Sequence, residues 1–408
     1  MSYQGIQIRN RIGSILVLLA IFLSVSIAEA SVYNTGTYPE GSFIDPAAHI
    51  DVDSFSIGSE SYIAPFTSFT GEYAKIGSHS NVQDSGTNSG KIKIADNAVI
   101  AHGADLIGNV EIGNMAFVGF NSIINNSKIG DGAYIGVRSK ITGIDIPAGK
   151  SVPAGSVIDS QDDIRNLGPV TKAQVVFVND VIEVNRALAV GYSQLYENRG
   201  QEAFGKTGPS GGRNIVIESR VILGYSGTIE PSIGNGASIG NARVIGNVKL
   251  GDNARIDDGT SIRGDEGVPI IIGDNAQIGK DNTFHSLNKK MVVIGNDFKL
   301  GSDAVIHGPV DIGNNVRVGN RAVVFKSNVG NNVIIGDNAV VTGVKLLDGA
   351  VIPPETIVGS QADANKFNEP VRREGQATGS TPLIAIIVAA LIPSILGLVG
   401  SIVLKNKH

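Results

Sequence analysis

Aliphatic residues recur in this chain every six positions, and the whole series occurs twice, 200 residues apart. The first series is Ile94, Ile100, Leu106, Ile112, Val118 and Ile124, then, after a slip of one residue, Ile129, Ile135 and Ile141. The second series is Ile294, Leu300, Ile306, Ile312, Val318, Val324, Val329, Ile335 and Val341. A period of six matches neither an α-helix nor the alternation of a half-buried strand. It is typical of a hexapeptide β-helix, in which coils of about 18 residues stack around one aliphatic core.

The composition fits such a core. Aromatic residues make up only 5% of the chain and Trp is absent, so Ile and Val must fill the interior. The 52 glycines, together with Asn and Asp, supply the turn conformations that the corners of each coil need. We therefore predict a mainly β fold of two tandem left-handed parallel β-helices. An amphipathic pattern over Lys172–Asn198 predicts an α-helix that packs on the first of them.

The N-terminal end differs from the rest of the chain. Arg9 and Arg11 precede an apolar run over 12–27, and small residues at Ala28 and Ala30 follow it. This pattern is typical of a secretory signal peptide that is cleaved after Ala30. The alternative is a membrane anchor that is retained.

The C-terminal end carries a second apolar segment. Residues 383–404 form a run of 22 without a charge, which as a helix would be about 33 Å long and would cross a bilayer. Lys405 and Lys407 follow it, and positive charge favours the cytoplasmic side. We therefore expect the rest of the chain to lie at the cell surface, outside the cytoplasmic membrane and anchored by this helix.

These patterns together predict the organisation of the chain. The expected segments are a signal peptide (1–30), a first β-helix domain with its packed helix (31–198), a linker (199–213), a second β-helix domain (214–363), a polar stalk (364–381), a transmembrane helix (382–404) and a cytoplasmic tail (405–408).

Charge and cysteine content exclude several classes of function. The net charge is −5 with both signs interspersed, so no basic face for nucleic acid is predicted. The absence of cysteine excludes disulfides, thiolate metal sites and cysteine nucleophiles. Histidine and carboxylate side chains remain as candidate metal ligands.

Short motifs in both halves resemble one family of β-helix proteins. The second half contains SIRGDEGVPIIIGD, FHSL and IHGP, and the first contains SNVQD, IAHGADLIG and VVFVNDVIEVNRALAVGY. Together they resemble the gamma-class carbonic anhydrases, most closely the secreted archaeal type, over roughly residues 40–195 and 214–365. The resemblance implies a trimer of β-helices that holds zinc between neighbours. Two histidine ligands then come from one β-helix and the third from the next.

Neither half keeps all three of the family's histidines. In the second half His285 and His307 match the first and third, but Ser302 stands where the second belongs. In the first half His102 matches the second, but Ile107 stands where the third belongs. The losses are complementary, so the resemblance implies one composite metal site made of His102, His285 and His307.

The family's supporting residues divide between the halves in the same way. By resemblance, Arg263 and Asp265 are the interface pair and Glu266 is a nearby acid in the second half. Asn81 and Gln83 match the residues beside the metal in the first half, and Asn179 on the predicted helix matches a substrate-side Asn.

The resemblance implies a zinc-dependent carbonic anhydrase that interconverts carbon dioxide and bicarbonate, with iron or cobalt as possible alternatives to zinc. Gln83 would then hold the attacking hydroxide in line, Asn179 would meet the substrate and Glu266 would carry the proton. A homo-oligomer, or a mixed ring with another family subunit, is the expected assembly. Two alternatives remain open: a non-catalytic surface scaffold or partner subunit of the same family, and a hexapeptide-repeat acyltransferase.

Overall fold

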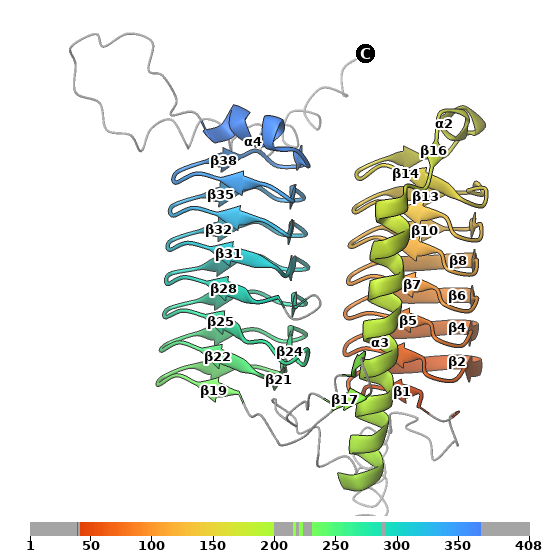
Figure 1. Ribbon diagram of the computed structural model, residues 1–408, viewed down its shortest axis with the longest axis horizontal. Coiled ribbons are helices and arrows are strands. Elements are labelled where there is room, and N and C mark those ends of the chain that lie inside the picture. The colour runs from red at the N-terminus through yellow and green to blue at the C-terminus, as the bar shows by residue number, and fades with distance from the viewer. Residues whose placement is uncertain are drawn as a thin grey trace, which may run out of the picture. The chain divides into compact units, whose positions relative to one another are not determined.

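The fold is known from a computed structural model that describes residues 39, 41–199, 215–217, 220–222, 231–286 and 290–368. Each half of the chain forms a solenoid of short parallel strands, seen as a stack of coils in Figure 1. The predicted signal peptide, transmembrane helix and tail, and residues 200–213 of the predicted linker, lie outside the described residues. Within the described ranges, no helix is both long and apolar enough to cross a membrane.

The first solenoid contains two sheets, and its strands pair in parallel except for the last pair, β14 with β16. The first sheet has the order β1 (Phe43–Ile44), β3 (Tyr62–Ile63), β5 (Asn81–Val82), β7 (Val99–Ile100), β9 (Phe117–Val118), β12 (Tyr134–Ile135), β14 (Lys150–Val152), β16 (Gly168–Pro169). The second has the order β15 (Val157–Ile158), β13 (Lys140–Thr142), β10 (Ile123–Asn125), β8 (Asp105–Ile112), β6 (Thr87–Ile94), β4 (Ser68–Ile76), β2 (His49–Ile57), and β11 (Lys128–Ile129) also pairs with β8.

The second solenoid is a three-faced prism with one sheet of seven strands on each face. The first sheet is β19 (Ser232–Ile233), β22 (Val248–Leu250), β25 (Ile270–Ile272), β28 (Val292–Ile294), β31 (Val310–Ile312), β34 (Asn328–Val329), β37 (Lys345–Leu346). The second is β20 (Ser238–Ile239), β23 (Arg255–Ile256), β26 (Gln277–Ile278), β29 (Lys299–Leu300), β32 (Arg317–Val318), β35 (Ile334–Ile335), β38 (Val351–Ile352). The third is β21 (Arg243–Gly246), β24 (Ser261–Gly264), β27 (Thr283–His285), β30 (Val305–His307), β33 (Val323–Phe325), β36 (Val340–Thr342), β39 (Ile357–Val358). Before this prism, β17 (Ile215–Ile217) and β18 (Arg220–Ile222) form a small antiparallel pair.

The predicted aliphatic series fills both cores. Every member of the two series is buried, from Ile94 to Ile141 in the first solenoid and from Ile294 to Val341 in the second. Each solenoid has one continuous aliphatic cluster of its own. Burial of each such side chain stabilises the fold by roughly 1.5–3 kcal/mol, so the repeat supplies the main stabilising term. The prediction of a mainly β fold built from hexapeptide repeats is confirmed.

The corners of the coils explain the abundance of asparagine. Asn253, Asn275, Asp297, Asn315 and Asn332 occupy successive corners of the second solenoid with positive φ. Asn and Asp tolerate this conformation better than other residues with a side chain. Their side chains also bond from coil to coil, as from Asn275 Nδ2 to Asp297 Oδ1 at 3.0 Å.

A long helix follows the first solenoid, as predicted. It is α3 (Lys172–Arg199), preceded by the short α2 (Gln161–Arg165). A reciprocal pair of bonds between Thr171 and Gln174 caps its beginning. Farther along, Tyr192 stacks on Phe43 and Tyr62 of the first sheet, with ring centroids 5.3 and 5.7 Å away. The helix runs along the coils of this solenoid in Figure 1 and covers one face of it.

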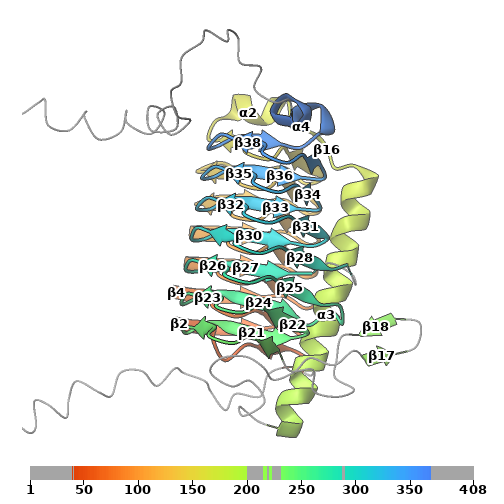
Figure 2. The same ribbon diagram turned by 90° about the vertical axis from the view of Figure 1, so that its left-hand side faces the viewer.

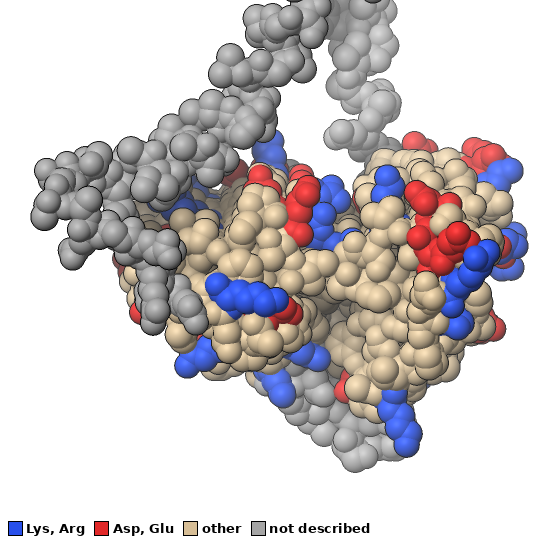
Figure 3. All heavy atoms as spheres, turned by 90° about the horizontal axis from the view of Figure 1, so that it is seen from above, with Lys and Arg blue, Asp and Glu red and all other residues tan. Residues whose placement is uncertain are grey.

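The second solenoid has no such helix in its described part. The short helix α4 (Gln361–Asn368) lies at its last coil, as Figure 2 shows, and includes the first five residues of the segment expected as a stalk. Charges of both signs are scattered over the surface seen in Figure 3, in agreement with the interspersed charges of the sequence.

Two coils of the second solenoid are longer than the others. Bonded corner residues are 22 positions apart from Asp252 to Asp274 and from Asp274 to Asn296, against 17 from Asn314 to Asn331. The additional residues lie between β24 and β25 and between β27 and β28 in the sequence. The first of these segments contains Asp265 and Glu266, and the second begins directly after His285.

Candidate metal centre

Parallel pairing stacks the two histidines of the second solenoid on one outer face. In the sheet that contains β24, β27 and β30, Arg263 pairs with His285, and His285 pairs with His307. Phe325 is next in the same row. Side chains in register on neighbouring parallel strands point the same way, so this row presents a guanidinium, two imidazoles and a phenyl ring in sequence.

His102 belongs to the first solenoid and follows strand β7. It lies one coil beyond Asp84, because β5 and β7 pair in register, and its Nδ1 lies 2.9 Å from Asp84 Oδ2. Both side chains are completely buried. The burial comes partly from the second solenoid, whose His307 ring lies 5.2 Å from the His102 ring.

The three histidines converge on one point. The ring centroids of His102 and His285 are 5.4 Å apart, and those of His285 and His307 are 5.3 Å apart. One ligand nitrogen from each residue lies within 4.8 Å of the others. Within the described residues, this is the only group of at least three histidine or carboxylate side chains with metal-binding geometry. A single chain therefore brings together the histidines that the sequence divides between its halves.

The outer contacts of the imidazoles suit a metal centre. His285 Nε2 lies 3.0 Å from Asp265 Oδ1, and His307 Nδ1 lies 3.4 Å from the Gly308 carbonyl oxygen. Metal-binding histidines commonly use their second nitrogen in this way, which fixes the ring orientation. His102 Nε2 and His285 Nδ1 are buried but have no hydrogen-bond partner in the part of the chain that the structure describes. Buried nitrogens without a partner are unfavourable unless a ligand satisfies them, so the residues fit a three-histidine metal site.

Burial also keeps the ligands in the form that binds metal. It lowers the pKa of His102 to about 4, although Asp84 opposes the shift. Burial, followed by the charges of His102 and His285, lowers the pKa of His307 well below its usual value. Both imidazoles are therefore neutral near pH 7, and only a neutral imidazole can coordinate a metal.

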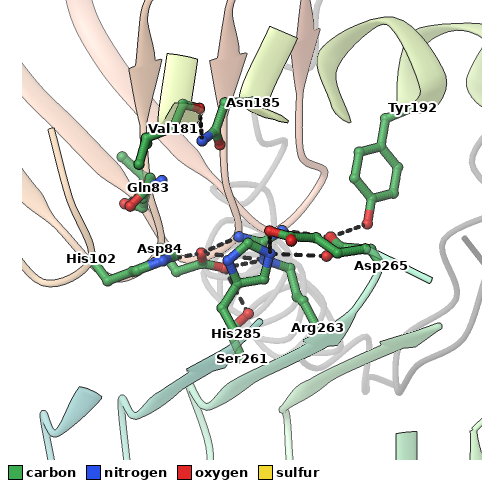
Figure 4. A network of polar contacts seen from close by, with 12 residues as sticks. Gln83, Asp84, His102, Val181, Asn185, Tyr192, Ser261, Arg263, Asp265 and His285 are labelled. Carbon is green, nitrogen blue, oxygen red and sulfur yellow. Dashed lines mark hydrogen bonds and ion pairs between the residues drawn. The ribbon is translucent and has the colours of Figure 1, made fainter. Parts of the chain in front are cut away.

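A buried ion network joins the two solenoids beside the histidines (Figure 4). Arg263 is fully buried, and its Nε and Nη2 donate to Asp84 of the first solenoid at 3.0 and 2.8 Å. Its Nη1 donates to Asp265, which also accepts from the Tyr192 hydroxyl on α3 at 2.6 Å. Ser261 Oγ donates to Asp84 at 2.7 Å. The two carboxylates that contact His102 and His285 are thus held by the same guanidinium.

The charges of this network are stable because they are paired. Burial alone would raise the pKa of Asp84, but Arg263 and His102 hold it well below its ordinary value. The pKa of Asp265 is lowered in the same way, because Arg263 and His285 outweigh its burial. Both carboxylates are therefore ionised near pH 7. A buried pair of this kind stabilises little in net terms, but loss of one partner costs about 3–5 kcal/mol.

A small cavity adjoins the histidines. Its lining combines three phenylalanines and two valines with two amide side chains, a carboxylate and two imidazoles. It is lined by Gln83, Phe117, Phe120, Phe177, Val181, Val184, Asn185, Glu266, His285 and His307.

Most of the residues singled out in the sequence lie at or beside this centre. Gln83 and Glu266 line the cavity, and Glu266 Oε1 lies 3.6 Å from His285 Nε2. Arg263 and Asp265 form the interface pair. Asn81, on strand β5 just before Gln83, is buried but is not among the cavity residues.

The placement expected for Asn179 is wrong. Its side chain is exposed and does not line the cavity, whereas Asn185 is only 2% exposed and does. Their separation of six positions corresponds to more than one and a half helical turns, so the two side chains leave α3 in different directions. Asn185 Nδ2 donates to the Val181 carbonyl oxygen, and its Oδ1 has no partner among the described residues.

Asp84, Asn185 and Tyr192 were not identified from the sequence. Asp84 had a usable signal, because it precedes His102 by 18 residues, which is one coil. Asn185 and Tyr192 had none beyond the amphipathic pattern of the helix. Their position depends on how α3 is rotated against the solenoid, which the periodicity alone does not fix.

Comparison with known proteins supports the repeat and a relationship to carbonic anhydrase. A family model described as bacterial transferase hexapeptide (six repeats) matches residues 291–326, and one described as hexapeptide repeat of succinyl-transferase matches 128–160 and 328–353. Among solved structures, a hexapeptide transferase family protein from Anaplasma phagocytophilum is 22% identical, covers 38% of this chain and 92% of its own, and has a TM-score of 0.29.

Two curated proteins are more similar in sequence. The carboxysome assembly protein CcmM of Nostoc sp. is 31% identical over 186 residues, which is 41% of this chain but only 32% of that protein. The carbonic anhydrase of Methanosarcina thermophila is 35% identical over 189 residues, which is 38% of this chain and 76% of the enzyme. The match to the enzyme covers most of its length and agrees with the histidine geometry, and the chain therefore belongs to the hexapeptide-repeat family of gamma-class carbonic anhydrases.

Proposed function

We propose that this chain is a metal-dependent carbonic anhydrase that interconverts carbon dioxide and bicarbonate at a site built from both of its solenoids. One observation carries the proposal. His102 from one solenoid meets His285 and His307 from the other, all three buried, with ligand atoms within 4.8 Å. Three imidazoles leave a fourth position open, which is the arrangement of catalytic rather than structural zinc.

Zinc is the proposed ion, and iron or cobalt could bind the same three nitrogens. An ion held there supplies Lewis acidity that makes water nucleophilic at neutral pH, an effect whose standard example is carbonic anhydrase itself. The chain's own residues do the rest. Phe117, Phe120 and Val181 give carbon dioxide an apolar surface and exclude bulk water.

The polar residues of the cavity lining orient the reactants. The amides of Gln83 and Asn185 lie in the lining, where they can direct the attacking oxygen and the oxygens of carbon dioxide. Glu266 lies within 3.6 Å of His285 and lines the same cavity, so its carboxylate is placed to accept a proton on its way out. Asp84 and Asp265 hold the imidazoles in orientation.

Each chain is proposed to hold a single site, because two other positions where the family has histidines are occupied by Ile107 and Ser302. Ile107, in the position that corresponds to His307, is 38% exposed. Ser302, which corresponds to His102, accepts a hydrogen bond from the Lys280 amide and donates one from its own amide to Asn320.

We further propose that the catalytic part lies outside the cell and is anchored by the segment 382–404, because the sequence patterns of both ends favour this location.

The test combines metal content with stopped-flow measurement of carbon dioxide hydration. Wild-type protein should contain about one equivalent of metal per chain, the number that a single three-histidine site would bind, and should catalyse hydration. His102→Ala should lose both, whereas His49→Ala, a change at an exposed histidine, should keep both. Full activity in His102→Ala would refute the shared site. Wild-type protein without bound metal or activity would instead favour a scaffold of the same family.

A further inference from the structure

Lys326 places a cation at the edge of the candidate site. Its Nζ lies 4.6 Å from the ring centroid of Phe177, which lines the cavity, and 4.8 Å from that of Phe325. Phe325 in turn packs edge-on against the His307 ring at 5.5 Å. The Lys326 side chain is exposed, so the ammonium lies over these two rings where solvent meets the cavity wall.

The backbone at Lys326 is unfavourable for a lysine. Its φ is 50°, in the left-handed region, where most corners of this solenoid have Asn or Asp. Asn126 occupies the corresponding corner of the first solenoid with φ 48°. Residues held in this region against their preference are concentrated at functional sites. The lysine is therefore present here despite the local backbone preference.

Among the described residues, no carboxylate forms an ion pair with Lys326 that would explain a lysine at this corner. Within the described part of the chain, its ammonium makes only the two ring contacts. The other charges that act on it are Lys290, of the same sign, and Asp180 on α3. Burial, followed by the charge of Lys290, lowers the pKa of Lys326, and Asp180 opposes this shift.

We propose that Lys326 binds a small oxyanion at the mouth of the cavity, and that bicarbonate is this anion. The inference rests on the proposed function, since bicarbonate is the only charged member of the reacting pair. The other described polar groups of the cavity lining are amides, imidazoles and the Glu266 carboxylate, and none of them is a lysine or arginine. A cation at the mouth therefore offsets the unfavourable potential of Glu266 and Asp265 for bicarbonate, and does nothing for neutral carbon dioxide.

The experiment compares Lys326→Met with Lys326→Arg and with Lys299→Met, which removes the same charge from an exposed position on another sheet. In the metal-loaded chain, Lys326→Met should raise the KM for bicarbonate, and its inhibition constant as product, by roughly threefold to tenfold at low salt. The KM for carbon dioxide should not change. Lys326→Arg and Lys299→Met should resemble wild type, and the effect of Lys326→Met should shrink as salt is added.

A second measurement separates this inference from the proposed function. Metal-free protein should broaden the carbon-13 resonance of labelled bicarbonate, and Lys326→Met should reduce the broadening. Bicarbonate broadening without hydration activity would refute the enzyme but keep the anion site. If Lys326→Met and Lys299→Met behave alike in both measurements, or if Lys326→Met raises both KM values equally, the anion site is refuted.

Discussion

At the residue scale, Asp84 links the assembly of the two solenoids to the candidate site. Its two carboxylate oxygens accept hydrogen bonds from Ser261 and Arg263 of the second solenoid. One of these oxygens also contacts His102, which belongs to the first solenoid like Asp84 itself. Asp265 has the matching position toward His285. The orientation of two of the three imidazoles therefore depends on an ion network that exists only when the solenoids are packed together.

The buried imidazoles predict how stability depends on pH in the metal-free protein. The pKa of His102 is about 4 in the folded chain and near 6.5 when unfolded. Between these values the unfolded state binds more protons, so the free energy of unfolding must fall as the pH falls from about 6.5 to about 4. His102 alone contributes a loss on the order of 3 kcal/mol over this window.

Urea titrations at pH 7 and pH 4 would measure this loss. His102→Asn should reduce the difference between the two pH values, because the imidazole that takes up the proton is gone. His49→Asn should leave the difference unchanged, because His49 is exposed. An equal pH dependence in wild type and His102→Asn would show that His102 does not titrate in this window.

At the scale of elements, α3 distinguishes the two solenoids. It covers the sheet that begins β1, β3, β5 and supplies Val181, Asn185 and Tyr192 to the region of the site. The related sheet of the second solenoid has no helix over it in the described residues and exposes Arg255, Gln277, Lys299 and Arg317 on successive strands instead. The helix thus covers an apolar face of the first solenoid, whereas the related face of the second solenoid is charged and exposed, and only the covered face contributes helix residues to the cavity lining among the described residues.

The bond from Tyr192 to Asp265 gives this helix a testable role. Tyr192→Phe leaves the stacked ring in place but removes a buried donor, which should lower the free energy of unfolding by about 1–3 kcal/mol. It should also weaken metal binding, because Asp265 orients His285. Tyr73→Phe is the matched control, since no hydrogen bond to the Tyr73 hydroxyl occurs within the described residues. Equal stability and metal affinity in the two variants would show that the bond is unimportant.

At the scale of the whole molecule, duplication with complementary loss leaves one group of three histidines in place of two separate sets. The second solenoid keeps His285 and His307 and the first keeps His102, and one chain brings them together. The homo-oligomer or mixed ring expected from the sequence remains a prediction, but the site does not need either to reach three ligands.

Mixing inactive variants distinguishes a site within one chain from a site between chains. His102→Ala and His285→Ala should each be inactive, and a mixture refolded together should remain inactive, because each chain lacks a ligand of its own site. A chain that carries both substitutions, refolded together with wild-type chain, is the control for exchange of subunits. Recovery of hydration activity in the mixture would show that the histidines come from different chains.

The sequence by itself determined the solenoids. One aliphatic side chain per face every six residues can be buried only in stacked coils, so the core from Ile94 to Val341 follows from periodicity alone. The family motifs also identified His102, His285 and His307. Only the tertiary structure decided that these histidines meet, that Asp84 and Tyr192 hold the network around them, and that Asn185 rather than Asn179 lines the cavity. The physical reason is that a repeat fixes which side chains point outward from the solenoid. The partners of these side chains depend on how the outer faces of the two solenoids and helix α3 pack together. Hydrophobic periodicity carries no information on the rotation of the helix or on the register between the two faces.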